Sequence, residues 1–248
     1  MPDKDWFPTR GPGGCEEVLL RCRSGRRNPY QWLARAVSPS TRLVLDVASG
    51  SGAMARELHR PDRVIVSLDL DEGELRRGRQ RVPGPQVCAD ATRLPFADAS
   101  FDAVTTSMGL AMVRPLPTLL GEVARVLKPG GIFAAIVPTI RPMSPSDLAR
   151  NAQLAMYLRT PPRLPGELEF TIAAHLHSGG LTKVEDGRER FRFPVRSRGD
   201  ADLLINGLYL PTDSDKRRDA AAEYLGRQVL ARGVVEIAVP IRRIIAIK

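Results

Sequence analysis

The sequence predicts one α/β domain with a doubly wound, mostly parallel sheet of seven strands and helices on both faces. Short apolar runs rich in β-branched residues recur along the chain, as is typical of buried strands. Helical patterns lie between several of these runs, which favours βαβ units. The length of 248 residues suits one large domain and does not require a second.

The first segment, residues 1–29, is rich in Pro, Gly and Arg. It predicts a partly ordered N-terminal extension with a short helix over 16–22. The domain proper is expected over 30–248, and it begins with a helix over 30–37 that Pro39 ends.

Seven segments have the pattern of strands. They are 43–48, 64–68, 86–89, 101–106, 132–137, 182–195 (a strand or a hairpin) and 234–247. The clearest helix covers 115–128, where leucines and valines repeat at helical spacing. Lys128, Pro129 and the two following glycines are expected to end this helix and turn the chain into the next strand.

After Pro138 the prolines become frequent around further helical patterns at 145–158, 167–177, 200–209 and 215–231. Segments that interrupt a sheet in this way often form a lid or a pocket wall. We expect such insertions at about 139–170 and 197–232.

The composition is that of an ordinary globular protein, with 43% apolar and 26% charged residues. No apolar run is long enough to span a bilayer, so a soluble protein without a membrane partner is expected. The first residues, MPDKDWFPTRGPGG, do not have the pattern of a secretory signal, which predicts a cytoplasmic location. Three cysteines without zinc-site spacing predict reduced thiols and no metal.

The net charge of +9 favours a polyanionic partner in principle, because Lys and Arg neutralise phosphates. The positive charge is nearly all arginine, however, and it is spread along the chain without a basic block. The charge pattern therefore gives little support to nucleic acid as a partner.

The stretch LVLDVASGSG, residues 43–52, is the first candidate for a ligand site. Asp46 interrupts an apolar strand, and a buried carboxylate is costly unless it is paired or accepts hydrogen bonds. The small residues that follow, Ala48, Ser49, Gly50 and Gly52 among them, leave room for a ligand against the main chain. A small-residue turn can also serve packing alone. Ala48 stands where such loops usually have glycine, and alanine is expected to fit wherever the backbone dihedrals allow it.

Asp69 supports the ligand interpretation, because it ends the next strand in VIVSLDLD. A carboxylate at this place holds the two ribose hydroxyls in doubly wound nucleotide-binding folds. The alternative is a role at the start of the next helix, which suits Asp71 and Glu72 better.

Four segments in this order, LDVASGSG, VSLDLDEGEL, CADATRLPFADASFDAV and EVARVLKPGGIF, resemble the class I S-adenosylmethionine-dependent methyltransferases. The most similar group includes the quinone-biosynthesis C-methyltransferases. The resemblance covers about 30–137. It implies a Rossmann-like fold, S-adenosyl-L-methionine as cofactor, and direct in-line methyl transfer without a universal catalytic residue.

Carried over by position, the family's roles place Asp46 and the backbone of 48–52 at the methionine part of the cofactor. Asp69 would accept from both ribose hydroxyls, and Leu70 would pack on the adenine.

Three further positions follow from the same resemblance. Asp90 would accept from the adenine amino group, with the Ala91 backbone close to the ring, although a turn role for Asp90 stays open. Ser107, with Met108, would border the methionine end. For Asp102 a structural role is favoured.

The methyl acceptor is sought in the segment TTSMGLAMV, residues 105–113. It lacks the Asn/Asp-Pro-Pro-aromatic signature of enzymes that methylate amide or base nitrogens, and the chain lacks a Pro-Cys pair for pyrimidine C5-methylation. Both absences count against nucleic acid. The leading hypothesis is a small apolar or aromatic acceptor; the alternatives are an RNA or protein methyltransferase and a binding module without transfer activity.

No catalytic residue is assigned. His175 or His177 could act as a base for a hydroxyl acceptor, but a role at a helix end is favoured for both, and for His59. Three aromatic side chains are candidates for an acceptor pocket or for the core: Tyr157, Phe170 and Tyr209. The acceptor, the methylated atom and the oligomeric state remain open.

Overall fold

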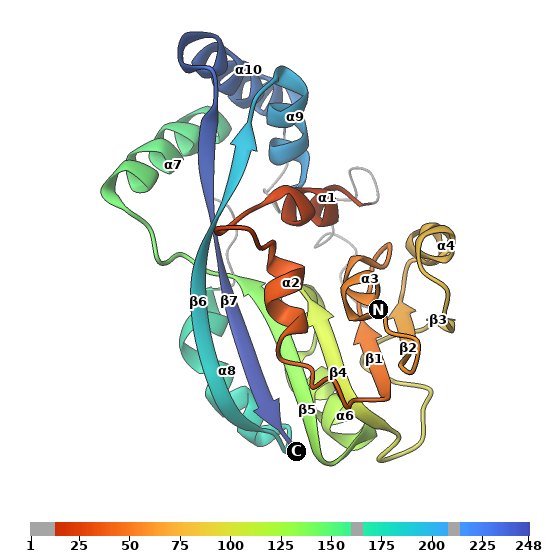
Figure 1. The fold of residues 1–248 in the computed structure, drawn as a ribbon. Coiled ribbons are helices and arrows are strands. Elements are labelled where there is room, and N and C mark those ends of the chain that lie inside the picture. The colour runs from red at the N-terminus through yellow and green to blue at the C-terminus, as the bar shows by residue number, and fades with distance from the viewer. Residues whose placement is uncertain (1–12, 160–165, 208–213) are drawn as a thin grey trace.

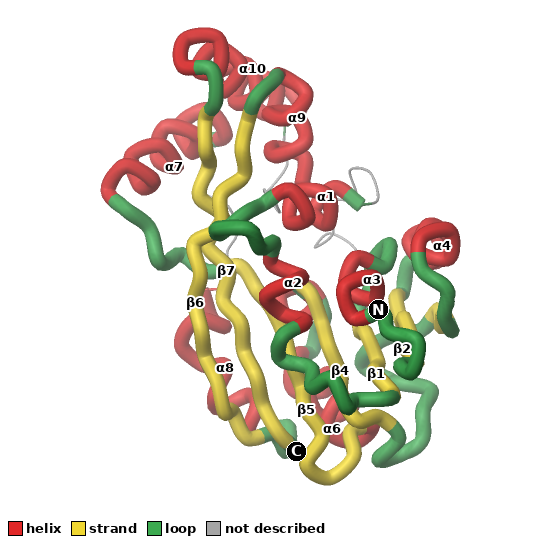
Figure 2. Tube along the Cα trace, in the orientation of Figure 1, coloured by secondary structure: helices red, strands yellow, loops and turns green. Residues whose placement is uncertain are grey.

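The computed structural model of the protein describes residues 13–159, 166–207 and 214–248. Its centre is a seven-stranded sheet with the order β3-β2-β1-β4-β5-β7-β6 (Figures 1 and 2). The strands are β1 Leu43–Val47, β2 Val64–Asp69, β3 Gln86–Cys88, β4 Phe101–Ser107, β5 Leu127–Pro138, β6 Thr182–Val195 and β7 Val235–Ile247. The pairs among β1 to β5 are parallel, and β7 runs antiparallel to both β5 and β6. The predicted fold class is confirmed.

Ten helices are described around this sheet. They are α1 Gly14–Arg21, α2 Pro29–Ala34, α3 Ala53–Leu58, α4 Glu72–Arg81, α5 Gly109–Met112, α6 Leu116–Val126, α7 Pro145–Leu158, α8 Gly166–Ser178, α9 Arg198–Gly207 and α10 Asp215–Arg232. For most of these helices, the ends predicted from the sequence lie within a few residues of the observed ends. One predicted end, Tyr209, lies outside the described residues.

Alternation along the central strands divides the core into two apolar clusters. Val44 of β1 faces the cluster that α2 and α3 cover, whereas its neighbour Leu45 faces the one that α6 and α8 cover. Successive strand residues point to opposite faces, so a strand that is buried on both sides must be apolar at nearly every position. This is why the strands could be recognised as continuous apolar runs.

The segment LKPGG departs from the prediction. Strand β5 already begins at Leu127, directly after α6, and Lys128 donates to the Asp102 carboxylate at 2.6 Å. Gly130 has φ +74° and donates to the carbonyl of Lys248 at 3.0 Å. Helix α6 thus ends two residues before Lys128, whose ammonium pairs with Asp102, and the β4–β5 register skips residues 128–131, where the sequence predicts a turn. Asp102 also accepts from the backbone of Arg42 and Leu43, so its structural role is confirmed.

Strands β6 and β7 extend past the end of β5 as a two-stranded ribbon. Residues 191–195 pair with 235–239 there, and β5 pairs with β7 from Ile241 onward. Helices α7, α9 and α10 gather around this ribbon, and α8 lies along the sheet against α6 (Figure 1). Of the predicted insertions, α7, α9 and α10 thus form a separate helical group, and α8 belongs to the body of the sheet.

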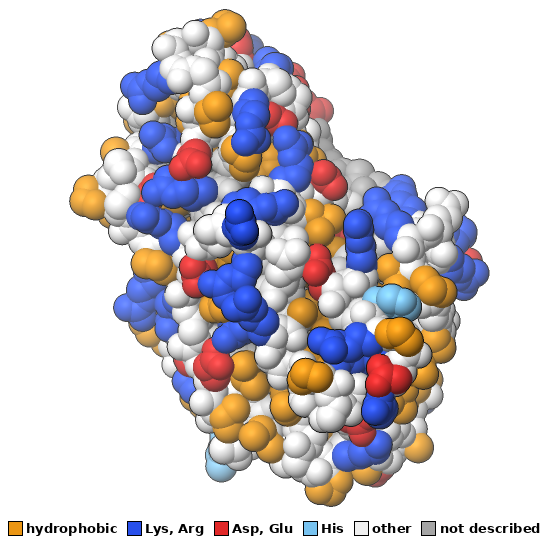
Figure 3. All heavy atoms as spheres, viewed as in Figure 1, with side chains coloured by type: hydrophobic (Ala, Val, Ile, Leu, Met, Phe, Trp, Pro, Cys, Tyr) orange, Lys and Arg blue, Asp and Glu red, His pale blue; other side chains and the backbone are white. Residues whose placement is uncertain are grey.

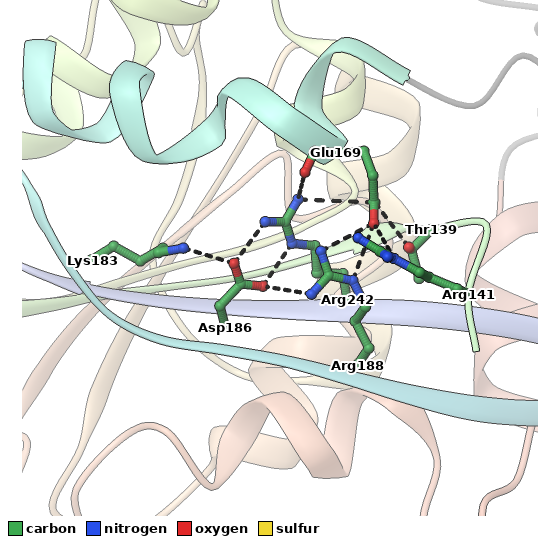
Figure 4. A network of polar contacts seen from close by, with 7 residues as sticks. All are labelled: Thr139, Arg141, Glu169, Lys183, Asp186, Arg188 and Arg242. Atoms are coloured by element: carbon green, nitrogen blue, oxygen red, sulfur yellow. Dashed lines mark hydrogen bonds and ion pairs between the residues drawn. The ribbon is translucent and has the colours of Figure 1, made fainter.

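An ionic network fastens α8 to the adjoining strands (Figure 4). Arg242 of β7 makes two hydrogen bonds of 2.7 Å to Asp186 of β6. Glu169 of α8 accepts from Thr139 at 2.9 Å and from Arg188 at 3.1 Å. Because Arg242 and Glu169 are almost fully buried, the interaction between these two side chains is protected from solvent screening.

Candidate cofactor site

The carboxyl ends of β1, β2, β3 and β4 meet at one edge of the sheet. The strand order reverses between β1 and β4, and ligands of doubly wound folds bind at such a switch point. The loop 48–52 follows β1 here. Its Ser49 N–H donates to the carbonyl of Leu68 at the end of β2 at 3.0 Å, while the Ser49 hydroxyl is buried without a partner.

Backbone conformation explains the small residues of the loop. Gly50 and Gly52 have φ values of +54° and +89°. Ala48 also lies in the left-handed region, with φ +52°. A side chain with a Cβ is strained in this region, so alanine fits the position only at a cost.

Asp46 is fully buried at the end of β1. One oxygen accepts from the Thr105 hydroxyl at 2.8 Å, and the other has no partner. Burial raises the pKa of Asp46 to about 7, against the lowering effect of Thr105, and the carboxylates of Glu16 and Asp69 raise it further. A buried carboxylate oxygen without a donor fits a site that receives a cationic or hydrogen-bonding ligand.

Asp69 connects the end of β2 to the loop. Its carboxylate accepts the Gly50 N–H at 2.8 Å and the Asp71 N–H at 3.0 Å, and burial raises its pKa. Asp71 caps α4 by accepting the backbone N–H groups of Gly73 and Glu74, so the helix-start role assigned to it is confirmed. Leu70 lies between the two acids with 61% of its surface exposed.

Asp90 and Ala91 follow β3, the neighbour of β2. The Ala89 N–H donates to the Asp69 carbonyl at 3.1 Å, so Asp90 lies one residue from a direct contact with Asp69. The Asp90 carboxylate accepts from the backbone and the hydroxyl of Thr92, each at 2.8 Å. This is the turn role that the sequence left open, and Asp90 is exposed.

Ser107 and Met108 end β4 on the other side of β1. Ser107 lies beside Tyr30. Burial raises the pKa of Tyr30 well above its usual value, and the nearby Cys15 thiol and Glu16 carboxylate raise it further. The hydrogen bond with the Ser107 hydroxyl has the opposite effect on this pKa. Tyr30 therefore keeps its proton. The Thr106 hydroxyl is buried without a partner next to Gly109, where any Cβ would collide with it.

Sequence reasoning missed three residues of this site: Glu16, Arg81 and Thr105. The Glu16 carboxylate accepts the Ser51 N–H at 3.1 Å and the Arg81 guanidinium at 2.8 Å. Thr105 lies directly opposite Asp46 in the β1–β4 register, and a threonine within an apolar strand was a signal for it. Glu16 gave no signal, because its contact lies 35 residues away in the sequence.

The remaining candidates lie elsewhere. His175 and His177 occupy the last turn of α8, next to the start of β6, which pairs with the end of β7 at the amino end of β5. The structure thus does not bring them to the loop 48–52. Tyr157 of α7 stacks on Tyr224 of α10 with ring centroids 4.7 Å apart, and Phe170 is 80% exposed. His59 is exposed at the end of α3.

Among the described residues, no helix is long and apolar enough to cross a membrane. In the same part of the chain, no three His, Cys, Asp or Glu side chains are grouped to hold a metal ion. Figure 3 shows Lys and Arg spread over one face of the molecule and interleaved with acidic side chains.

Carboxylates at the ends of two adjacent parallel strands, around a loop of small residues at the switch point, define a doubly wound protein of the nucleotide-cofactor-binding class. Residues 45–135 match the family model described as a methyltransferase domain. A demethylmenaquinone methyltransferase of Corynebacterium kroppenstedtii is 33% identical over 162 residues, which cover 57% of this chain and 68% of that protein. The chain belongs to the class I S-adenosylmethionine-dependent methyltransferase family.

A second relative with the same name, from Beutenbergia cavernae, is 41% identical over 118 residues, or 47% of this chain and 48% of that protein. The chain spans about half the length of several curated relatives that it matches.

Solved structures support the fold over nearly the whole chain. A methyltransferase-type structure from Bacillus halodurans has a TM-score of 0.61 at 19% identity and covers 89% of this chain and 98% of its own. The [4+2]-cyclase SpnF has a TM-score of 0.59 at 18% identity, and the match covers 95% of this chain and 93% of the cyclase chain. At this identity the likeness concerns the fold alone, and a cyclase among the neighbours illustrates that fold does not fix the reaction.

Proposed function

We propose that the protein transfers a methyl group from S-adenosyl-L-methionine to a small aromatic acceptor of the quinone type. The observation that carries the proposal is the site around the loop 48–52, where Asp46 has a buried oxygen without a partner and Asp69 is fixed to Gly50. The relatives named demethylmenaquinone methyltransferase support an acceptor of the quinone type.

The cofactor contacts are proposed from the same arrangement. Asp46 and the main chain of 48–52, with Ser49, would hold the methionine part, and Asp69 the ribose hydroxyls. Leu70 and Ala91 would pack on the adenine, with Asp90 accepting from its amino group, and Ser107 would border the methionine end. The cofactor, when bound, supplies an electrophilic methyl group on a positively charged sulfur.

What the chain contributes to the reaction is position and charge. Holding the two reactants at attack distance supplies much of the rate in an in-line displacement. The carboxylates of Asp46 and Asp69 provide negative charge beside the cationic cofactor. The helical group α7, α9 and α10 is proposed as the wall that covers the acceptor.

The direct test uses cofactor with a labelled methyl group. The purified protein is incubated separately with a short-chain demethylated naphthoquinol, with total RNA and with a protein extract. We expect label in the quinol alone, and its loss with the variant Asp69→Ala. Label in RNA or protein and none in the quinol would overturn the proposed acceptor class, and no cofactor binding by calorimetry would overturn the activity itself.

A further inference from the structure

Glu16 occupies an unusual position for a glutamate on a short helix. It is one of the few charged residues buried in the protein, with 9% of its surface exposed, whereas its neighbour Glu17 is exposed. A buried carboxylate persists only when donors surround it. The donors around Glu16 come from the cofactor loop.

One oxygen of Glu16 accepts the backbone N–H of Ser51 at 3.1 Å and that of Ala53 at 3.4 Å. The other accepts from the Ser51 hydroxyl and from Arg81 of α4. A Cβ on Gly50 would lie 3.3 Å from the Glu16 carboxylate, so the side chain lies directly against the loop. Glu16 thus joins the loop to α1 and α4 through one carboxylate.

The opposite side of α1 is fixed to the helical group of the β6–β7 ribbon (Figure 1). Gly14 and Gly207 allow α1 and α9 to approach closely, because a Cβ on Gly207 would lie 2.6 Å from the Gly14 carbonyl oxygen. Arg21 forms an ion pair with Asp200 of α9. Helix α1 therefore connects the proposed acceptor wall to the loop, and Glu16 is its contact on the loop side.

We infer that Glu16 is a positioning residue for the cofactor: it holds the loop 48–52 against α1 in the conformation that binds the cofactor. The inference rests on the proposed function, since it concerns the same site. It adds to that site a residue from outside the region that the methyltransferase family model matches.

The test compares Glu16→Gln with the matched control Glu17→Gln, which makes the same charge change on the exposed side of the same helix. Calorimetry should show about a tenfold or greater loss of S-adenosylmethionine affinity for Glu16→Gln, because hydrogen bonds to a charged acceptor are lost or weakened. Glu17→Gln should bind as the wild type does. In steady-state kinetics the KM for the cofactor should rise while kcat and the acceptor KM stay close to wild type.

Hydrogen exchange gives a readout that needs no activity. The amides of Ser51 and Ala53 should exchange faster in Glu16→Gln than in the control, and Glu16→Asp should restore part of the protection. Thermal unfolding without cofactor identifies a variant that fails through loss of fold.

The outcomes separate this inference from the proposed function. If the wild type does not bind the cofactor, the proposed function fails, and this inference fails with it. If the wild type binds and Glu16→Gln binds equally well, with unchanged exchange at Ser51 and Ala53, the positioning role alone is overturned.

Discussion

Asp46 and Thr105 face each other across β1 and β4, and their hydrogen bond of 2.8 Å satisfies only one of the two carboxylate oxygens. The other oxygen is buried without a donor in a group whose pKa is about 7. Ionisation of Asp46 and binding of a cationic ligand should therefore favour each other.

The first prediction is a pH dependence of cofactor affinity. Since the bound cofactor carries positive charge, affinity should rise about tenfold as the pH increases from about 6 to about 7.5 and Asp46 loses its proton. Calorimetry over this range measures it. The variant Asp46→Asn should bind weakly and with less dependence on pH, and Thr105→Val should move the midpoint to higher pH because a hydrogen bond to the charged form is lost. A wild-type affinity that decreases as the pH is raised from about 6 to about 7.5 would contradict the prediction.

The same group should make the cofactor-free protein less stable as pH rises. The pKa of Asp46 in the folded state lies above the value of about 4 in the unfolded chain, so the folded state binds the proton more tightly. Its contribution to the free energy of unfolding is complete below about pH 4 and is lost as pH rises to about 7. Comparing the wild type with Asp46→Asn isolates this contribution, because the asparagine does not titrate.

The second prediction concerns the strained loop residue. Ala48→Gly should stabilise the protein by about 1 kcal/mol, because glycine adopts φ +52° without strain, and should leave cofactor affinity within a few-fold. Ala48→Val should weaken cofactor binding strongly, because a β-branched side chain fits this conformation poorly and crowds the loop. Thermal unfolding and dissociation constants measure both effects.

Ala99 offers a matched control. It has φ +51° and is exposed in a turn outside the loop. Ala99→Gly should raise Tm as Ala48→Gly does and leave cofactor affinity unchanged. If Ala48→Gly lowers Tm while Ala99→Gly raises it, the left-handed conformation of Ala48 does not destabilise the protein, and the prediction is contradicted.

Asp46, Asp69 and Ala48 show which features of the cofactor site could be predicted from the sequence and which could not. The strands, Asp46 and Asp69 could be found because burial on both faces makes strands continuously apolar, so a polar residue at a strand end stands out. The left-handed conformation of Ala48 could not, because alanine seldom adopts it.

Contacts between distant segments account for the other failures. Lys128 and Pro129 have the composition of a helix end, yet α6 already ends at Val126, because Leu127 pairs with Phe101 of β4 and Lys128 forms an ion pair with Asp102. The contact between Glu16 and Ser51 depends on how α1 packs, and nothing in the local sequence distinguishes Glu16 from the exposed Glu17. Local sequence patterns indicate where helices and strands form, whereas contacts between distant segments arise only when those elements pack together.

The third prediction separates two acids that are two residues apart. Asp69→Asn should reduce cofactor affinity about tenfold or more, because it removes the charge proposed to accept from the ribose hydroxyls and weakens the bond to Gly50. Asp71→Asn should retain the cofactor affinity and cost at most about 1 kcal/mol of stability, since asparagine also caps helices. Equal losses of affinity for the two variants would remove the ribose role from Asp69.

The fourth prediction concerns the buried ionic network of Figure 4. Arg242→Met should reduce the free energy of unfolding by about 3 kcal/mol, because it leaves the carboxylates of Asp186 and Glu169 without their buried partner. Arg227→Met removes an arginine from an exposed pair with Glu223 and should cost less than about 1 kcal/mol. Chemical denaturation of the two variants at neutral pH gives the comparison.

Acid should act on the same network. The hydrogen bonds from Arg242 lower the pKa of Asp186 below its usual value, with Lys183 contributing as well. A carboxylate with a lowered pKa stabilises the fold above its unfolded pKa of about 4 and loses that contribution as pH falls toward its folded pKa. The wild type should therefore lose stability below about pH 4 more steeply than Asp186→Asn, whose side chain does not titrate. If the free energy of unfolding falls equally steeply below about pH 4 in both proteins, the network does not lower the pKa of Asp186.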